Sequence, residues 1–210
     1  MNLKEIMTWR YAAKQFDTSK KVNSETLNRI LEITNLSATS YGLQPYMTVV
    51  VKNQDLKEKL VSASYGQTNV SDSSHVIIFA ARTDIDENFI NNFIKLTAEA
   101  RNTDVEKLKS FREMLNKSFS SKTDDEIYNW ASKQAYLALG TFLIACADEG
   151  VDACPIGGFV PEEYDKILNL SDYNLRSVVV AAIGYRHKDD KYQYYKKVRK
   201  SSGEMIIEID

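Results

Sequence analysis

The feature that most constrains the fold of this chain is an apolar run in its second half. Across residues 135–147 only Thr141 interrupts a series of apolar residues and glycine. A helix of this composition has no polar face, so we expect it to be covered on nearly all sides. The run is shorter than the roughly 18 apolar residues of a membrane span, and Lys133 and Asp148 stand close to its ends. The sequence therefore predicts a long core helix that begins near Trp130 inside a soluble protein.

The residues after this helix predict a helix stop, a short strand and a turn. Gly150 is the residue type that takes the left-handed conformation at a helix end. Residues 151–154 suit a short strand, and residues 155–159, Pro-Ile-Gly-Gly-Phe, suit a turn whose glycines let a ligand approach the main chain. A flat ligand would fit there. Glycine pairs also mark ordinary tight turns, so both interpretations stay open at this point.

Length and composition predict one domain over residues 1–210. With 43% hydrophobic residues the chain can bury a substantial core. The formal net charge is −2 and both signs are spread along the sequence, so neither a nucleic acid nor a membrane partner is expected. The N-terminus lacks the apolar segment of a secretory signal, which predicts a cytoplasmic protein. Cys146 and Cys154 lack C-x-x-C spacing, so we expect them to be buried and apolar in character.

Hydrophobic spacing and turn residues predict the remaining elements. Helices are expected over residues 2–9, from 23 or 24, over 55–64 and from 161, and strands over 47–51, 75–81 and 177–185. Residues 84–125 are charged and contain neither glycine nor proline, which predicts helices outside the main sheet. This excursion could be a lid, a dimer arm or a solvated helical hairpin. Residues 205–209 predict a strand too short to be stable alone, so it must add to a sheet of this chain or of a partner.

The chain lacks the residues of most self-sufficient active sites. It has no G-x-G-x-x-G and no G-x-x-x-x-G-K-[ST] phosphate loop. Its histidines, His75 and His187, are far apart and have no further ligand at metal-binding spacing, so no metal site is expected. A G-x-S-x-G nucleophile elbow is also missing. An enzyme with these residues must take its chemistry from an organic cofactor.

Cations near the two ends of the chain would suit such a cofactor. Arg10, Lys197 and Arg199 can converge on a phosphate through charge-assisted hydrogen bonds. Lys14 would then lie further along the same ligand, where a lysine near the pyrimidine edge of a flavin stabilises the anionic reduced ring. A solvated basic edge is the alternative interpretation of the cationic residues 192–200.

Polar side chains and accessible main chain would complete a flavin site. Gln67 and Asn69 can both donate to and accept from the edge of the ring. The backbone amides of residues 156–158 can face the ring without obstruction by bulky side chains. A flavin is therefore a cofactor that these residues suit.

Six motifs occur in the chain in a fixed order. They are R-x-x-x-K at Arg10, S-x-G-L-Q-P-Y at Ser40, G-Q-x-N at Gly66, W-x-x-K-Q-A-Y at Trp130, C-P-I-G-G-F at Cys154 and K-x-R at Lys197. In this order, across residues 1–201, they resemble the FMN-dependent nitroreductase family. The resemblance implies an α+β fold with a mixed central sheet flanked by helices, in an intertwined homodimer. It also implies FMN at the dimer interface and ping-pong electron transfer from NADH or NADPH to a nitroaromatic, quinone or similar flat acceptor.

The resemblance further implies which residues contact the cofactor. The cations near the two ends would hold the phosphate, and Lys14 would lie beside the flavin pyrimidine. Residues 38–40 would belong to a loop that the other subunit lends to the flavin, and the main chain of residues 155–158 would face its reactive N5 edge. The full implied set is Arg10, Tyr11, Ala12, Lys14, Ala38, Thr39, Ser40, Gln67, Asn69, Pro155, Ile156, Gly157, Gly158, Lys197 and Arg199.

Two residues depart from the family pattern. Many members have serine where this chain has Ala12, and many have glutamate where it has Gly157. FMN is still expected to bind, because the family contact near N5 is made largely by a backbone N–H group. The two departures are expected to affect the turnover rate or the choice of acceptor.

Aromatic residues of the excursion are candidates for contact with the acceptor. Phe111 and Phe119 are the two that we single out, and the buried stripe of a helical hairpin is the alternative for each. Two other functions stay open. One is a flavin carrier or sensor with little turnover, and the other is a branch of the family that fragments the flavin or removes halogen from aromatic substrates.

Overall fold

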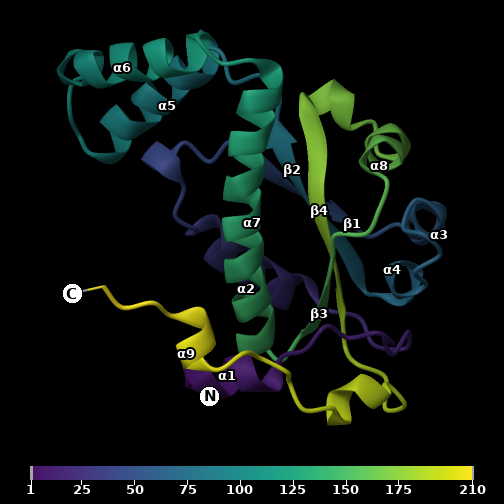
Figure 1. Ribbon diagram of the computed structural model, residues 1–210. Coiled ribbons are helices and arrows are strands. Elements are labelled where there is room, and N and C mark those ends of the chain that lie inside the picture. Colours follow the sequence, from purple (N-terminus) through teal and green to yellow (C-terminus); the bar gives the residue numbers. More distant parts are fainter. Residues whose placement is uncertain (1, 210) are drawn as a thin grey trace.

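The computed structural model of the protein describes residues 2–209 and is built on a four-stranded sheet (Figure 1). The strands lie in the order β1 (Tyr46–Val51), β2 (His75–Arg82), β4 (Leu175–Gly184) and β3 (Asp152–Ile156). All three ladders are antiparallel. Parallel pairing within residues 2–209 is limited to an isolated bridge between Ala12 and Ala153. The predicted α+β class is confirmed, but the predicted mixed sheet is wrong for the single chain, in which every ladder is antiparallel.

Several of the helices begin where a polar side chain accepts a hydrogen bond from one of the first free amide groups. Asn2 and Glu5 form a capping box on the first helix, and Thr123 and Glu126 form one on the longest. The α-helices are α1 (Leu3–Trp9), α2 (Ser24–Asn35), α3 (Gln54–Ser62), α4 (Asn69–Asp72), α5 (Glu87–Ala100), α6 (Lys109–Ser120), α7 (Asp124–Asp148), α8 (Pro161–Ile167) and α9 (Ser202–Met205). Short 3-10 helices are η1 (Ser40–Gly42), η2 (Val105–Leu108), η3 (Leu170–Tyr173) and η4 (Lys191–Tyr194).

Helix α7 is the predicted core helix, and it begins before the predicted start near Trp130 because the capping box at Thr123 fixes its first turn. One face packs on the sheet, where Phe142 meets Phe79 edge to face with ring centroids 5.5 Å apart. The opposite face is open, with Tyr136 52% and Leu137 55% exposed. The prediction that α7 is covered on nearly all sides is therefore wrong for the single chain. None of the helices within residues 2–209 is long and apolar enough to cross a membrane.

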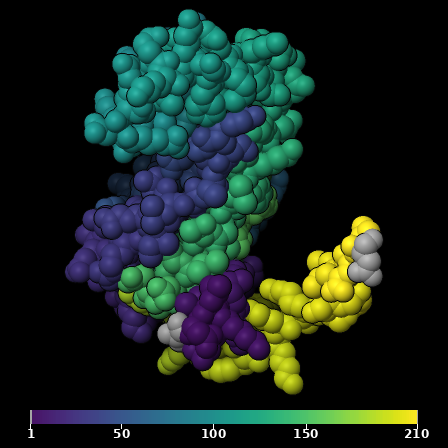
Figure 2. Space-filling view, turned by 90° about the vertical axis from the view of Figure 1, so that its left-hand side faces the viewer, coloured from purple at the N-terminus to yellow at the C-terminus, as the bar shows by residue number. Residues whose placement is uncertain are grey.

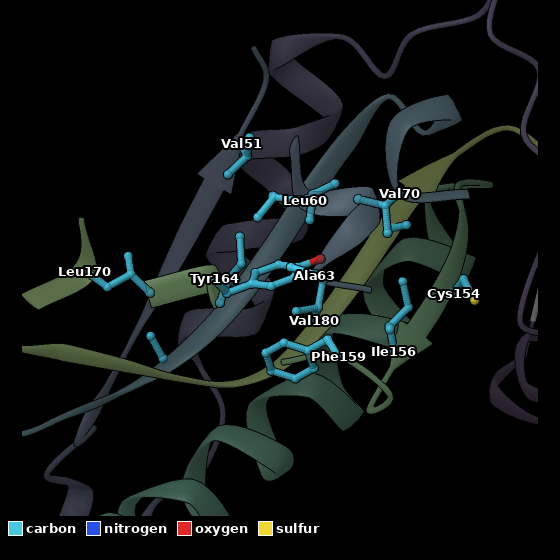
Figure 3. Packing of buried hydrophobic residues seen from close by; sticks show 14 of the residues in the cluster. Val51, Leu60, Ala63, Val70, Cys154, Ile156, Phe159, Tyr164, Leu170 and Val180 are labelled. Carbon is cyan, nitrogen blue, oxygen red and sulfur yellow. The ribbon is translucent and has the colours of Figure 1, made fainter. Parts of the chain in front are cut away.

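Two helical layers cover the two faces of the sheet. Helices α2 and α7 pack on one face, around Ile77 and Phe79 of β2. Helices α3, α4 and α8 lie over the other face (Figure 1). Figure 3 shows that second cluster, in which the rings of Tyr164 and Phe159 lie edge to face with centroids 4.9 Å apart. Cys154 lies at its margin, on the side toward the β3 edge (Figure 3).

The excursion of residues 84–125 forms α5, η2 and α6, a hairpin at one end of α7 and away from the sheet (Figure 1). Its inner side is a separate apolar cluster that includes Ile94, Leu115 and Phe119 and is continued by Ala131 of α7. The predicted location of these helices, outside the main sheet, is confirmed. The hairpin is therefore anchored to the body of the protein by the start of α7.

The predicted strand over residues 205–209 is wrong for the single chain. Met205 ends the short helix α9, and residues 206–209 pair with no strand within residues 2–209. Ile207 is 89% exposed and Ile209 is 91% exposed. In Figure 2 this tail projects away from the body of the molecule. A segment of this length needs a neighbouring strand edge to become a strand, and the single chain brings none to it. That the tail reaches a partner subunit stays a prediction.

Candidate functional site

The loop between α1 and α2 lies along the open edge of β3 and against the chain that leaves β4. Its Ala13 N–H donates to Ala153 O at 3.4 Å, and its Asp17 N–H donates to Tyr185 O at 2.8 Å. Phe16 forms an isolated antiparallel bridge with Arg186. These contacts place residues 10–14 beside β3, which is next to the predicted turn at residues 155–159.

The side chain of Asp190 holds this loop through hydrogen bonds. One of its carboxylate oxygens, Oδ2, accepts hydrogen bonds from the Tyr11 hydroxyl at 3.0 Å and from the Lys14 N–H at 2.8 Å. Its other oxygen, Oδ1, accepts from the Tyr192 N–H at 3.1 Å and so caps η4. Burial and then the bond to Asp190 raise the pKa of the Tyr11 phenol, which keeps its proton.

A second buried acid fixes the same loop through an arginine. The Arg186 guanidinium lies 2.6 Å from an oxygen of Asp152 and 4.2 Å and 4.6 Å from the ring centroids of Trp9 and Tyr11. The Arg186 Nε–H also donates to Asp152 Oδ1 at 2.8 Å, whereas its Nη2 atom is buried without a hydrogen-bond partner within residues 2–209. Arg186 is thus paired with Asp152 and stacked on two rings, which fixes the loop beside β3.

Three cations, Arg10, Lys197 and Arg199, converge near this loop. Burial and then the neighbouring Arg199 lower the pKa of Arg10. Burial, and then Arg10 and Arg199, lower the pKa of Lys197. The Lys197 ammonium donates to Thr8 O, and the Arg199 guanidinium donates to Val198 O at 2.7 Å. Within residues 2–209 none of the three cations forms a salt bridge, so no acidic side chain balances the positive charge of the cluster. A bound anion would balance it.

Lys14 and Asn69 meet at the sulfur atom of Cys154. The Lys14 ammonium lies 3.7 Å from Cys154 Sγ, and the Asn69 side-chain amide lies 3.3 Å from it. Asn69 is 5% exposed, and its Oδ1 atom is buried without a hydrogen-bond partner within residues 2–209. A buried acceptor without a donor is rare in folded proteins. It is the kind of group that a bound ligand with an N–H or O–H would satisfy.

The predicted turn at residues 155–159 is in part strand. Pro155 and Ile156 belong to β3, which tolerates the proline because β3 is an edge strand and pairs with β4 alone. Only from Gly157 does the chain leave the sheet. The Gln67 side-chain amide donates to Gly158 O at 2.8 Å, so one predicted site residue orients the main chain of another. A Cβ atom at Gly157 would meet nothing within 4 Å.

The loop of residues 38–40 lies elsewhere in the single chain, against α7. The Ser40 N–H donates to Gln134 Oε1 at 2.9 Å, and the Gln44 N–H donates to Thr39 Oγ1 at 3.1 Å. Within residues 2–209, Ala38, Thr39 and Ser40 form no hydrogen bond with the other predicted site residues. The structure therefore brings together predicted site residues from both ends of the chain, from residues 67–69 and from β3, but not from this loop.

The two aromatic candidates of the excursion have different surroundings. Phe119 is buried and packs edge to face on Trp130, with centroids 4.8 Å apart. Its surroundings favour the buried stripe of a hairpin. Phe111 is half-buried, and its ring centroid lies 6.4 Å from that of Tyr41, which follows the 38–40 loop. Phe111 is therefore the candidate that stands near an exposed surface.

Sequence reasoning missed the residues that hold the site in place. Asp152, Arg186 and Asp190 were not predicted, and Cys154 was assigned only a buried apolar role. Asp190 follows Asp189 in a polar stretch that looks like an ordinary loop. Only the fold shows that Asp190 is buried while Asp189 is exposed.

Comparison with known proteins gives the family. A sequence model described as the nitroreductase family matches residues 7–185, so the chain belongs to the nitroreductase family and is an oxidoreductase. A Staphylococcus epidermidis protein, "Putative NAD(P)H nitroreductase SERP2086", is 34% identical over 96% of this chain and 94% of its own.

Solved structures agree on the fold. The protein ydfN of Bacillus subtilis superposes with a TM-score of 0.87 at 23% identity and covers 98% of both chains. A protein of Exiguobacterium sibiricum, solved in complex with FMN, superposes with a TM-score of 0.84 at 20% identity, covering 100% of this chain and 98% of that chain. The predicted nitroreductase-like fold is thus confirmed.

Proposed function

We propose that the protein is an FMN-dependent oxidoreductase that passes electrons from NADH or NADPH to a nitroaromatic, quinone or similar flat acceptor. The observation that carries the proposal is the convergence of Arg10, Lys197 and Arg199 without an acidic partner within residues 2–209. Cations that lower one another's pKa favour a bound anion, and a phosphate offers several acceptor oxygens. The name of the Staphylococcus epidermidis relative and the FMN in the Exiguobacterium sibiricum structure support this donor and this cofactor.

Two groups of side chains would hold FMN in this proposal. The three cations would bind its phosphate, and Lys14 would stabilise negative charge on its ring. Asn69 Oδ1, buried and without a donor, would accept from an N–H or O–H group of the cofactor. Bound FMN would supply the hydride chemistry, in a ping-pong cycle between the nicotinamide donor and the acceptor.

We further propose that the working unit is a homodimer. The open face of α7 presents Tyr136 and Leu137 to solvent, and the tail presents Ile207 and Ile209. Exposed apolar side chains on a helix face and on a projecting tail are typical of surfaces that a partner covers. A partner subunit that covers α7 would also bring its own residues 38–40 toward the flavin, which supports the role of this loop. One chain alone would leave the site without them.

A flavin carrier with little turnover is the second candidate function. It is favoured by Gly157, which leaves open space and no carboxylate beside the main chain that would face the flavin. Ala12 likewise offers no hydroxyl near the phosphate. A carrier would still bind FMN, but it would be reduced once and would not turn over.

Anaerobic absorbance spectra of the purified protein with FMN separate these candidates. The oxidoreductase is expected to bleach with NADH or NADPH and to recover its oxidised-flavin spectrum when a nitroaromatic or a quinone is added. Bleaching without recovery would favour the carrier. Absence of flavin binding would refute both functions and with them the assignment of the cation cluster.

The cation cluster can be tested on its own by Arg10→Ala. Loss of one charged hydrogen-bonded contact should weaken FMN binding by about 1.5–3 kcal/mol. Flavin fluorescence titration measures the change. The control is Arg101→Ala, because Arg101 lies at the exposed end of α5 and contacts none of the site residues. If Arg10→Ala and Arg101→Ala bind FMN equally well, Arg10 does not belong to the site.

A further inference from the structure

The proposed phosphate site is assembled from two chain segments that are far apart in the sequence. Arg10 and Lys14 lie on the loop after α1, whereas Lys197 and Arg199 lie on the segment that follows η4. A single phosphate binds both segments more tightly when their relative position is fixed before it binds, because less ordering is then needed. A side chain that connects the two segments would provide this.

We infer that Asp190 is this connection, a positioning residue that fixes both cation-bearing segments at once. The inference rests on the proposed function, because it assumes that the cluster binds the phosphate of FMN. Asp190 Oδ2 accepts from the first segment, from the Tyr11 hydroxyl, the Lys14 N–H and, at 3.3 Å, the Gln15 N–H. Asp190 Oδ1 accepts from the Tyr192 N–H and so caps η4, the short helix that leads directly into the second segment.

The chemistry of these bonds requires a carboxylate. Asp190 is 1% exposed, and each of its four donors is a neutral N–H or O–H group. Within residues 2–209 it takes part in no salt bridge, so its charge is stabilised by these donors alone. An asparagine has one acceptor oxygen and one donor group. Asp190→Asn would therefore turn an N–H group toward the donors of one of the two segments.

The rest of the loop keeps other attachments that Asp190→Asn leaves intact. His187 N–H donates to Gln15 O at 2.9 Å, and Asp17 N–H donates to Tyr185 O at 2.8 Å. Lys197 still reaches Thr8 O. The substitution should thus disturb the alignment of the two segments. It should not unfold the sheet, because these remaining bonds lie next to the sheet.

Electrostatics alone predicts the opposite result, and this makes the test decisive. Removing a negative charge near a phosphate site should strengthen phosphate binding if charge were the only effect. If Asp190 positions the cations, the same substitution should weaken it. Asp189→Asn is the matched control. Asp189 is the neighbouring residue in the sequence, its side chain is 70% exposed, and its carboxylate lies 3.6 Å from His187 Nδ1.

The experiment measures the affinities of wild type, Asp190→Asn and Asp189→Asn for FMN and for riboflavin, which lacks the phosphate. Asp190→Asn should bind FMN about 10-fold more weakly, the effect of one lost hydrogen bond to a charged group. Its preference for FMN over riboflavin should fall, which a general loss of stability would not cause. Asp189→Asn should keep the wild-type preference.

Each other outcome has a definite meaning. An unchanged or increased preference for FMN in Asp190→Asn overturns the inference and leaves the proposed function standing. A wild-type protein that binds neither flavin overturns the proposed function. If Asp190→Asn does not fold, Tyr11→Phe removes one of the four donors and takes its place, with the same fall in preference expected on a smaller scale. An unchanged preference in Tyr11→Phe would then overturn the inference.

Discussion

The two faces of α7 have similar apolar composition and opposite surroundings. On one face Ala135, Ala138 and Phe142 are buried against the sheet and α2. On the other face Tyr136 and Leu137 stand half exposed. The hydrophobic effect favours the removal of both faces from water to a similar extent. The composition of a helix face thus indicates that the face must be covered. Only the fold shows whether the same chain covers it.

Phe142→Ala should have the largest effect and tests the buried face. The ring is fully buried and meets Phe79 edge to face, so its removal loses apolar burial and leaves a cavity. We expect the free energy of unfolding to fall by about 3–5 kcal/mol. Urea denaturation followed by circular dichroism measures this loss. A loss below about 1 kcal/mol would mean that the face is less tightly packed than the structure shows.

Leu137→Arg tests the open face. A charge in the proposed interface should weaken self-association by about 100-fold, because an unpaired charge would be buried there. The fold of each chain should stay intact, since Leu137 is exposed in the single chain. Analytical ultracentrifugation gives the association constant. Leu96→Arg, at an exposed position on α5, is the control. Equal association of both variants would place the interface elsewhere.

Truncation after Gly203 asks whether the tail belongs to the same interface. The truncation deletes Met205, Ile207 and Ile209, apolar side chains that the single chain does not bury. We expect association to weaken about 10-fold, with little change in the unfolding of each chain. Wild-type association of the truncated chain would count against an intertwined dimer and would leave α7 as the main contact.

The last prediction is a pH dependence of stability, and it concerns the buried face again. His75 opens β2, the strand on which α7 packs, and burial lowers its pKa from 6.5 to about 4. The unfolded chain therefore takes up a proton first as the pH falls. Stability should be fully present above pH 6.5 and should decrease toward pH 4. Thermal unfolding at several pH values measures this, and His75→Gln should flatten the curve. A wild-type curve as flat as that of the variant would contradict it.

Much of the fold could be predicted from local patterns. The strand at 75–81 and the helix after Asn23 follow from uninterrupted apolar residues and from a cap, both of which act within a few residues. The start of α7 was misplaced because the capping box at Thr123 precedes the apolar run on which the prediction rested. The tail was predicted as a strand because strand propensity is local, whereas strand formation needs an edge to pair with.

The site could be predicted only as far as its ligand-facing residues. Arg10, Lys14 and Asn69 are polar residues without an evident structural role, and the structure places Lys14 and Asn69 at one sulfur atom. Asp190 and Arg186 could not be predicted, because their role depends on burial and on partners far away in the sequence. A charged residue in a loop looks the same whether solvent or the chain itself surrounds it.

The contact between Lys197 and Thr8 joins positions 189 residues apart, and all four strands are complete by Gly184. During synthesis Arg10 leaves the ribosome long before Lys197 and Arg199 do. The segments that form the sheet therefore emerge while the proposed phosphate site still lacks two of its three cations. A chain that stopped before η4 would contain neither Lys197 nor Arg199, so occupancy of the site by the cofactor would report that translation had passed Arg199.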